Sequence, residues 1–138
     1  MTTAESANFL NLDLEIESRS DLSALAQHMG EQVLVLFNGA TERGFRLALE
    51  PIIETALSRN PQACLNHFVT LLRSLPVELT AIWNDCTSRV FDYGFDGGFE
   101  SPPQNTTICA NSLLQIANLG ADVRITIYPF QAEEIVIE

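Results

Sequence analysis

Apolar and polar residues alternate strictly near the start of the chain. The apolar positions are Leu10, Leu12, Leu14 and Ile16, and the polar ones are Asn11, Asp13, Glu15 and Glu17. A period of two is typical of a β-strand with one face buried and the other in water. Residues 9–17 are therefore predicted to form a half-buried strand.

Similar apolar patterns predict five further strands. They cover residues 32–37, 45–50, 89–96, about 104–109 and the stretch around 123–127. Asn38-Gly39 indicates a turn, so the second and third strands are predicted to pair as a hairpin with a loop of about seven residues. The fourth strand places Phe91, Tyr93 and Phe95 on one face.

Helical spacing of apolar residues predicts four helices, at residues 22–29, 61–75, 77–86 and 113–119. Asn60-Pro61 is a cap with proline at the first helical position, and Asn111-Ser112 is predicted to cap the last helix. Gly30 and Gly120 follow the first and last helices, where glycine commonly ends a helix.

The order of these elements predicts one domain over residues 1–138 with an α+β fold. We expect a two-layer sandwich, in which helices cover one face of a mixed sheet of about six strands. Residues 25–37 and 116–127 repeat the order helix, glycine, strand, each after an expected strand. They are predicted to form two split β-α-β-like units, whose origin by duplication the apolar pattern leaves open.

The opening LDLEIESRSDLSALAQHMG and the ending SLLQIANLGADVRITIYP resemble the two ends of a bacterial domain-of-unknown-function family. The similarity covers roughly residues 10–50 and 104–130, and its shared features are mostly core periodicity and helix stops. It implies an α/β fold without assigned catalytic residues and a connection to immunity-type roles. No functional residue is carried over from it.

Charge narrows the classes of function. The chain has 18 acidic and 7 basic side chains, all of the latter arginine, for a net charge of −11. The absence of lysine excludes Schiff-base and P-loop lysine chemistry. So acidic a chain is expected to bind neither nucleic acid nor an anionic membrane.

The other compositional signals favour a cytoplasmic protein. The longest apolar run, residues 33–37, is far too short for a membrane helix, and the N-terminus has no apolar signal segment. Three separated cysteines, Cys64, Cys86 and Cys109, indicate reduced thiols. The apolar neighbours of Cys64 and Cys109 predict that both are buried.

Metal and catalytic motifs are weak. Cys64 and His67 stand three residues apart on a predicted helix, but the usual complementary ligand pair is missing, so no metal site is expected. The carboxylates Asp92, Asp96 and Glu100 surround a segment rich in aromatic residues and glycine. They could serve as acid and base or hold a cation, and they are candidate binding residues together with Tyr93 and Phe99.

The polar face of the sheet gives a second set of candidates. This set comprises Asp13 and Glu15 on the first strand, Arg46 on the third, and Arg124 and Tyr128 on the last. Like charges opposite each other destabilise a strand pair, so the acidic strand is expected beside an arginine-bearing one. The last strand is the favoured neighbour.

The hypothesis favoured by these patterns is a small, acidic, non-catalytic interaction module of a bacterial cytosol, immunity-like and binding a basic protein partner. No cofactor is expected. One alternative is a metal-dependent hydrolase or metal-binding protein that uses Asp92, Asp96 and Glu100. Another is a homo-oligomeric structural protein, for which a homodimer is the simplest form.

Overall fold

The computed structural model describes residues 8–97 and 105–129. Its strands are β1 (Phe9–Ser18), β2 (Val33–Thr41), β3 (Gly44–Pro51), β4 (Ser88–Asp96) and β5 (Asp122–Tyr128). Its α-helices are α1 (Ser23–Met29), α2 (Pro61–Arg73), α3 (Val77–Asn84) and α4 (Ala110–Asn118), with 3-10 turns η1 (Gly30–Gln32) and η2 (Thr55–Leu57).

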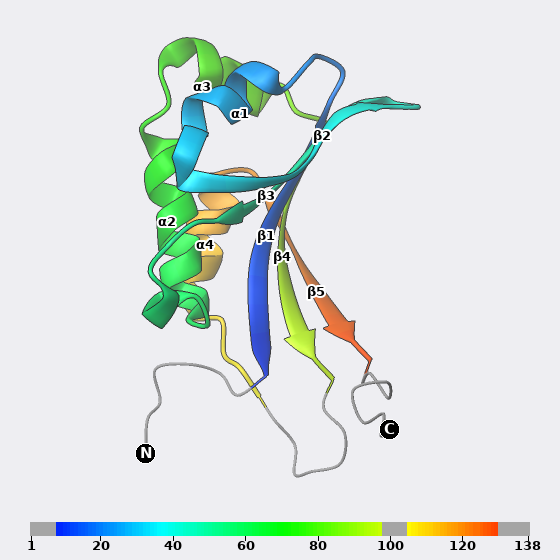
Figure 1. Ribbon diagram of the computed structural model, residues 1–138. Coiled ribbons are helices and arrows are strands. Elements are labelled where there is room, and N and C mark those ends of the chain that lie inside the picture. Colours follow the sequence, from blue (N-terminus) through cyan, green and yellow to red (C-terminus); the bar gives the residue numbers. More distant parts are fainter. Residues whose placement is uncertain (1–7, 98–104, 130–138) are drawn as a thin grey trace.

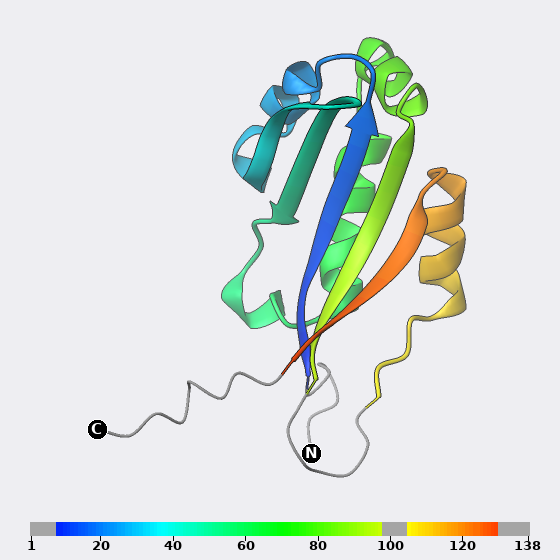
Figure 2. The same cartoon turned by 90° about the vertical axis from the view of Figure 1, so that its right-hand side faces the viewer.

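The strands form one mixed sheet in the order β2-β3-β1-β4-β5. The helices lie on one side of this sheet (Figure 1), and Figure 2 looks onto the other side, which the described helices leave uncovered. The predicted α+β class, with helices on one face of a mixed sheet, is therefore confirmed in outline.

The core lies between β1, β4 and α2. Leu12, Leu14 and Ile16 of β1 are fully buried on the helix side, as the alternation predicts. Phe68 of α2 meets Phe91 of β4 edge to face, with their ring centroids 5.8 Å apart. Burial of these apolar faces is the main force that holds α2 against the sheet.

Asn60 caps α2 as predicted. Its side-chain oxygen accepts a hydrogen bond from the backbone N–H of Ala63 at 3.0 Å, and Pro61 is the first helical residue. Gly30 follows α1 with a φ of 54°, and Gly120 follows the end of α4 with a φ of 73°. Both glycine stops are therefore confirmed, because this conformation is costly for other residues.

The sheet has five strands, and the strand expected at about 104–109 is wrong. Residues 105–109 have no regular structure, and α4 begins at Ala110 rather than at 113. Cys109, not Asn111 or Ser112, occupies the N-cap position. The segment is too short and too polar to bury one face, so it serves as the connection into α4.

The hairpin turn also differs from the prediction. Asn38 and Gly39 lie inside β2, where they pair with Leu47 and Arg46 of β3, and the chain turns at residues 42–43. A bulge between Val35 and Phe37 adds one residue to β2. The ladder to β3 thus outweighs the local turn preference of Asn-Gly.

The two β-α-β-like units differ in form. β1 and β2 both run antiparallel to β3, which lies between them, so they are parallel to each other and form a split unit around α1. In the second unit, the first strand was expected at about residues 104–109, but the strand that occupies this role is β4. It lies directly beside β5, in parallel, and α4 precedes β5 in the connection between them.

β5 is only partly covered on its apolar side. Its alternation is as predicted, but Val123, Ile125 and Ile127 all remain exposed. Within residues 8–97 and 105–129, no helix has the length and apolar character needed to cross a membrane.

Candidate functional site

The helix-free face of the sheet brings together most of the residues predicted from the polar pattern. Glu15 of β1 lies at the centre: its Oε1 accepts a hydrogen bond from Arg124 Nη1 at 2.8 Å and lies 3.4 Å from Arg46 Nη2. Burial raises the pKa of Glu15, but the hydrogen bonds and charges of Arg124 and Arg46 outweigh burial and lower the pKa overall.

The prediction of which strand lies beside the acidic strand, β1, was only half right. β1 lies beside β3, which carries Arg46, whereas β5 is separated from β1 by β4. Arg124 nevertheless reaches Glu15, because its long side chain spans the intervening strand. Strand order could not be read from charge alone, since an arginine can satisfy a carboxylate two strands away.

Asp92 of β4 anchors the same network. The residue is buried, at 8% relative exposure. Its Oδ1 accepts a hydrogen bond from Thr126 Oγ1 at 2.7 Å, and its Oδ2 lies 3.4 Å from Arg124 Nη1. The sequence places Thr126 on this face but gives no signal of its contact with Asp92. These contacts occupy both oxygens of a carboxylate that was a candidate acid or ligand.

Asp13 is less well satisfied. In the β1–β4 pair it lies directly opposite Asp92, the like-charge arrangement that the sequence argument expected the sheet to avoid. Its buried Oδ1 has no hydrogen-bond partner among the described residues. Burial, followed by the nearby charges of Glu50, Asp92 and Glu15, raises the pKa of Asp13 to about 7.

Glu50 of β3 completes the acidic group on this face. Its Oε2 accepts a hydrogen bond from Asn11 Nδ2 at 3.2 Å, and its charge is the largest electrostatic influence on Asp13 after burial. The alternation of residues along the strand places Glu50 on the polar face, but the sequence does not show that Glu50 lies near Asp13. That proximity depends on the β1–β3 register.

Tyr128 lies across β4 at Gly94. A side chain at Gly94 would meet the Tyr128 ring at 3.1 Å and would clash with the Asn11 amide. Burial, together with the charges of Asp92 and Asp13, raises the pKa of the Tyr128 phenol, which therefore stays protonated at neutral pH. A glycine inside a strand pattern often marks such a close approach, and this was the available signal for Gly94.

The described candidates of the aromatic and acidic segment, Asp92, Tyr93 and Asp96, do not all share one face of the sheet. Tyr93 faces the opposite way, into the core, where burial raises its pKa to about 12, so its side chain does not lie on the face that carries Asp92. Asp96 is exposed at the end of β4, in register with Tyr128. Phe99 and Glu100 lie outside the described residues.

Metal-binding side chains do not gather in the described part of the chain, where no group of three or more His, Cys, Asp or Glu is arranged to hold an ion. Cys64 contacts the Ser58 carbonyl and His67 the Gln32 carbonyl. Cys64 and Cys86 are buried, whereas Cys109 is exposed, so the predicted burial of Cys109 is wrong.

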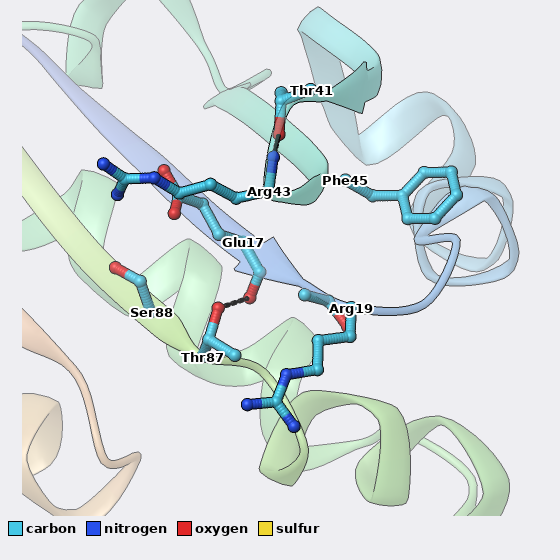
Figure 3. Close-up of a pocket in the computed structure, with 8 residues that line it drawn as sticks. Glu17, Arg19, Thr41, Arg43, Phe45, Thr87 and Ser88 are labelled. Atoms are coloured by element: carbon cyan, nitrogen blue, oxygen red, sulfur yellow. Dashed lines mark hydrogen bonds between the residues drawn. The ribbon is translucent and has the colours of Figure 1, made fainter.

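A polar hollow of about 440 Å³ opens beside the end of β1 and the β2–β3 turn. Its lining includes Glu17, Arg19 and Arg43 (Figure 3). The guanidinium groups of Arg19 and Arg43 point to different sides of the hollow. The Thr87 hydroxyl donates a hydrogen bond to the backbone carbonyl of Glu17 at 3.2 Å. The hollow therefore offers no converging set of donors for an anion.

Comparison with known proteins found no matching family model, no matching curated protein and no matching solved structure.

Proposed function

We propose that the protein is a non-catalytic interaction module that binds a basic protein partner through the helix-free face of the sheet. The observation that carries the proposal is the excess of acid on this face. Strand register places two arginines there, Arg46 and Arg124, against seven acids: Asp13, Glu15, Glu17, Glu50, Asp92, Asp96 and Asp122.

The two arginines pair with Glu15 and Asp92, and within residues 8–97 and 105–129 no ion pair is formed by Asp13 or Glu50. A lysine or arginine side chain of a partner, placed beside Asp13, supplies the missing positive charge. Tyr128 adds an exposed ring and a neutral phenol next to the same carboxylates. Arginine and lysine side chains bind well to such combinations of carboxylate and aromatic ring.

The proposal includes the narrower function implied by the family resemblance. A bacterial cytosolic protein of an immunity type would use this acidic face to bind a basic toxin-like protein. The net charge of −11 supports that choice of partner, because opposite charges speed the encounter and suppress acidic competitors.

The test begins with capture of partners by the tagged full chain from lysate at low salt, followed by purification of each partner and calorimetry. We expect a basic partner whose affinity falls at least tenfold as salt is raised and surface charges are screened. The triple variant Asp13→Asn, Glu50→Gln and Asp92→Asn should abolish binding. The matched variant Glu31→Gln, Glu54→Gln and Glu78→Gln removes as many charges from exposed residues outside the five strands and should bind normally.

Equal binding by the two triple variants would overturn the proposal, as would a partner whose affinity is independent of salt. A second measurement addresses Asp13 directly. Because a partner's cation stabilises the ionised carboxylate, binding near pH 7 should release protons. Calorimetry in buffers of different ionisation enthalpy counts these protons, and Asp13→Asn should remove that release.

A further inference from the structure

The outer strand β2 is unusual for an exposed sheet edge. Four consecutive apolar residues, Leu34, Val35, Leu36 and Phe37, are each between 41% and 50% exposed. The whole strand, Val33–Thr41, contains no charged residue and no proline. Figures 1 and 2 show β2 at the opposite edge of the sheet from β5.

Edge strands normally carry features that prevent pairing with another chain, because their outward N–H and C=O groups are available to a new strand. Charged side chains and prolines are the commonest of these features. β5, at the other edge, has Asp122 and Arg124, and Arg124 is held in ion pairs. β2 has only the bulge between Val35 and Phe37.

We propose that β2 pairs with β2 of a second copy of this chain, antiparallel about a two-fold axis. The pair joins two five-stranded sheets into one ten-stranded sheet and covers the apolar side chains of residues 34–37 in both copies. This surface borders the acidic face assigned to a basic partner, since Leu34 pairs with Glu50 and the Arg46 guanidinium lies 5.5 Å from the centre of the Phe37 ring.

Charge supports a second copy as the occupant. Each chain carries a net charge of −11, so two copies can approach closely only where acids are absent, and β2 is an uncharged stretch nine residues long. In an antiparallel pair the start of one β2 lies near the end of the other. Glu31 precedes β2, and Glu42 and Arg43 form the turn after it, so Glu31 of one copy lies near both an acid and an arginine of the other. The flanking charges are therefore mixed, and the support for pairing comes from the uncharged strand between them.

An isologous pair also matches the composition of the strand. The same apolar segment meets itself, so each side chain that one copy presents is complemented by the other, as in most homodimers. An uncharged apolar strand offers nothing specific to a basic partner. The two surfaces are thus expected to respond differently to salt.

The first experiment measures the mass of the full chain by sedimentation equilibrium over a range of concentrations. We expect twice 15.2 kDa for the natural chain, and 15.2 kDa for Val35→Lys and for Leu36→Lys. Val77→Lys is the matched control, because Val77 is an exposed apolar residue on α3, away from β2. It should remain dimeric.

The second experiment places single cysteines at positions 34, 35, 36 and 37 in a Cys109→Ser background, since Cys109 is the exposed thiol of the described residues. Two-fold symmetry brings equivalent residues together only near the axis. Oxidation should therefore link two copies at one position or two positions within 34–37 and not at the others. Circular dichroism verifies that each variant is folded.

The dependence on salt concentration distinguishes dimerisation through β2 from binding of a basic partner. Screening weakens repulsion between two acidic copies, so dimerisation should tighten as salt is raised, whereas binding of a basic partner should weaken. A natural chain that stays at 15.2 kDa at high concentration would overturn the dimer, as would a dimer that survives both lysine substitutions. A monomer that uses β2 to bind a different protein would also contradict it.

Discussion

Asp13 and Asp92 lie opposite each other on neighbouring strands, an arrangement that costs free energy when both carboxylates are ionised. Asp92 is stabilised by Arg124 and Thr126, so the cost falls on Asp13. A carboxyl with a pKa of about 7 is partly protonated at neutral pH, and a small change of pH or the approach of a cation changes its charge.

The raised pKa of Asp13 predicts how the stability of the protein changes with pH. The folded state binds the Asp13 proton more tightly than the unfolded chain, whose pKa is near 3.8, so ionisation lowers stability as pH rises from about 4 to about 7. Asp13→Asn should therefore stabilise the protein by about 1–2 kcal/mol above pH 7, allowing for screening by solvent, and should have no effect near pH 4. Urea unfolding at a series of pH values measures this difference.

Glu17→Gln is the control for this measurement. It removes a charge from the same strand and the same face without the direct opposition to Asp92. A gain in stability that is equal at pH 4 and pH 8 for Asp13→Asn would contradict the assigned pKa. A loss of stability at pH 8 would show that the ionised form contributes a contact that asparagine cannot replace.

At the scale of elements, Arg89 of β4 joins the ends of two helices. Its Nε donates to the Gly120 carbonyl at 2.9 Å, and its Nη1 donates to the carbonyls of Trp83 and Cys86 at 2.9 and 3.0 Å. The guanidinium also lies 5.7 Å from the centre of the Trp83 ring. These carbonyls belong to residues at or just beyond the C-terminal ends of α3 and α4, where a cation is favourable.

Arg89→Met should lower the free energy of unfolding by about 3 kcal/mol, since three carbonyls lose a charged hydrogen-bond donor. Arg73→Met, at the exposed end of α2, should change it by less than about 0.5 kcal/mol. Thermal and urea unfolding give both values. If the two substitutions are equivalent, the Arg89 bonds contribute no net stability and the helix ends are held by packing alone.

Elements that bury one face were predictable from the sequence, and those defined by long-range pairing were not. The alternation at residues 9–17 and the Asn60-Pro61 cap correctly indicate β1 and the start of α2, because both signals are local. Asn38-Gly39 failed as a turn because pairing of β2 with β3 continues past it. Residues 105–109 failed as a strand because the segment is too short and too polar to bury one face.

The candidate site shows the same division. The alternation of residues along each strand correctly placed Asp13, Glu15 and Arg46 on the polar face of the sheet. The strand order β1-β4-β5, the register that opposes Asp13 to Asp92, and the position of Glu50 beside Asp13 depend on contacts between distant segments. The hydrophobic pattern fixes which face a residue occupies, but it does not fix its neighbours across strands.

For the whole molecule, seven of the 18 acids lie with two arginines on the helix-free face of the sheet. The seven acids on this face repel one another, and that repulsion is only partly relieved by the contacts of Arg46 and Arg124 with Glu15 and Asp92. Self-repulsion of this kind opposes the compact state. The acidic face is therefore expected to reduce stability in the absence of a partner.

This arrangement predicts how salt changes stability. Raising NaCl from about 20 mM to about 300 mM shortens the screening length from over 20 Å to about 6 Å, so the melting temperature should rise. Asp13→Asn, Glu17→Gln and Asp122→Asn together should reduce that rise. The triple variant Glu31→Gln, Glu54→Gln and Glu78→Gln, outside the five strands, changes net charge by the same amount and should reduce the rise less, because its acids are more dispersed along the chain. Scanning calorimetry at both salt concentrations measures the rise in melting temperature. An equal reduction of this rise by the two triple variants would mean that the total charge of the chain, and not the charge on one face, sets the repulsion.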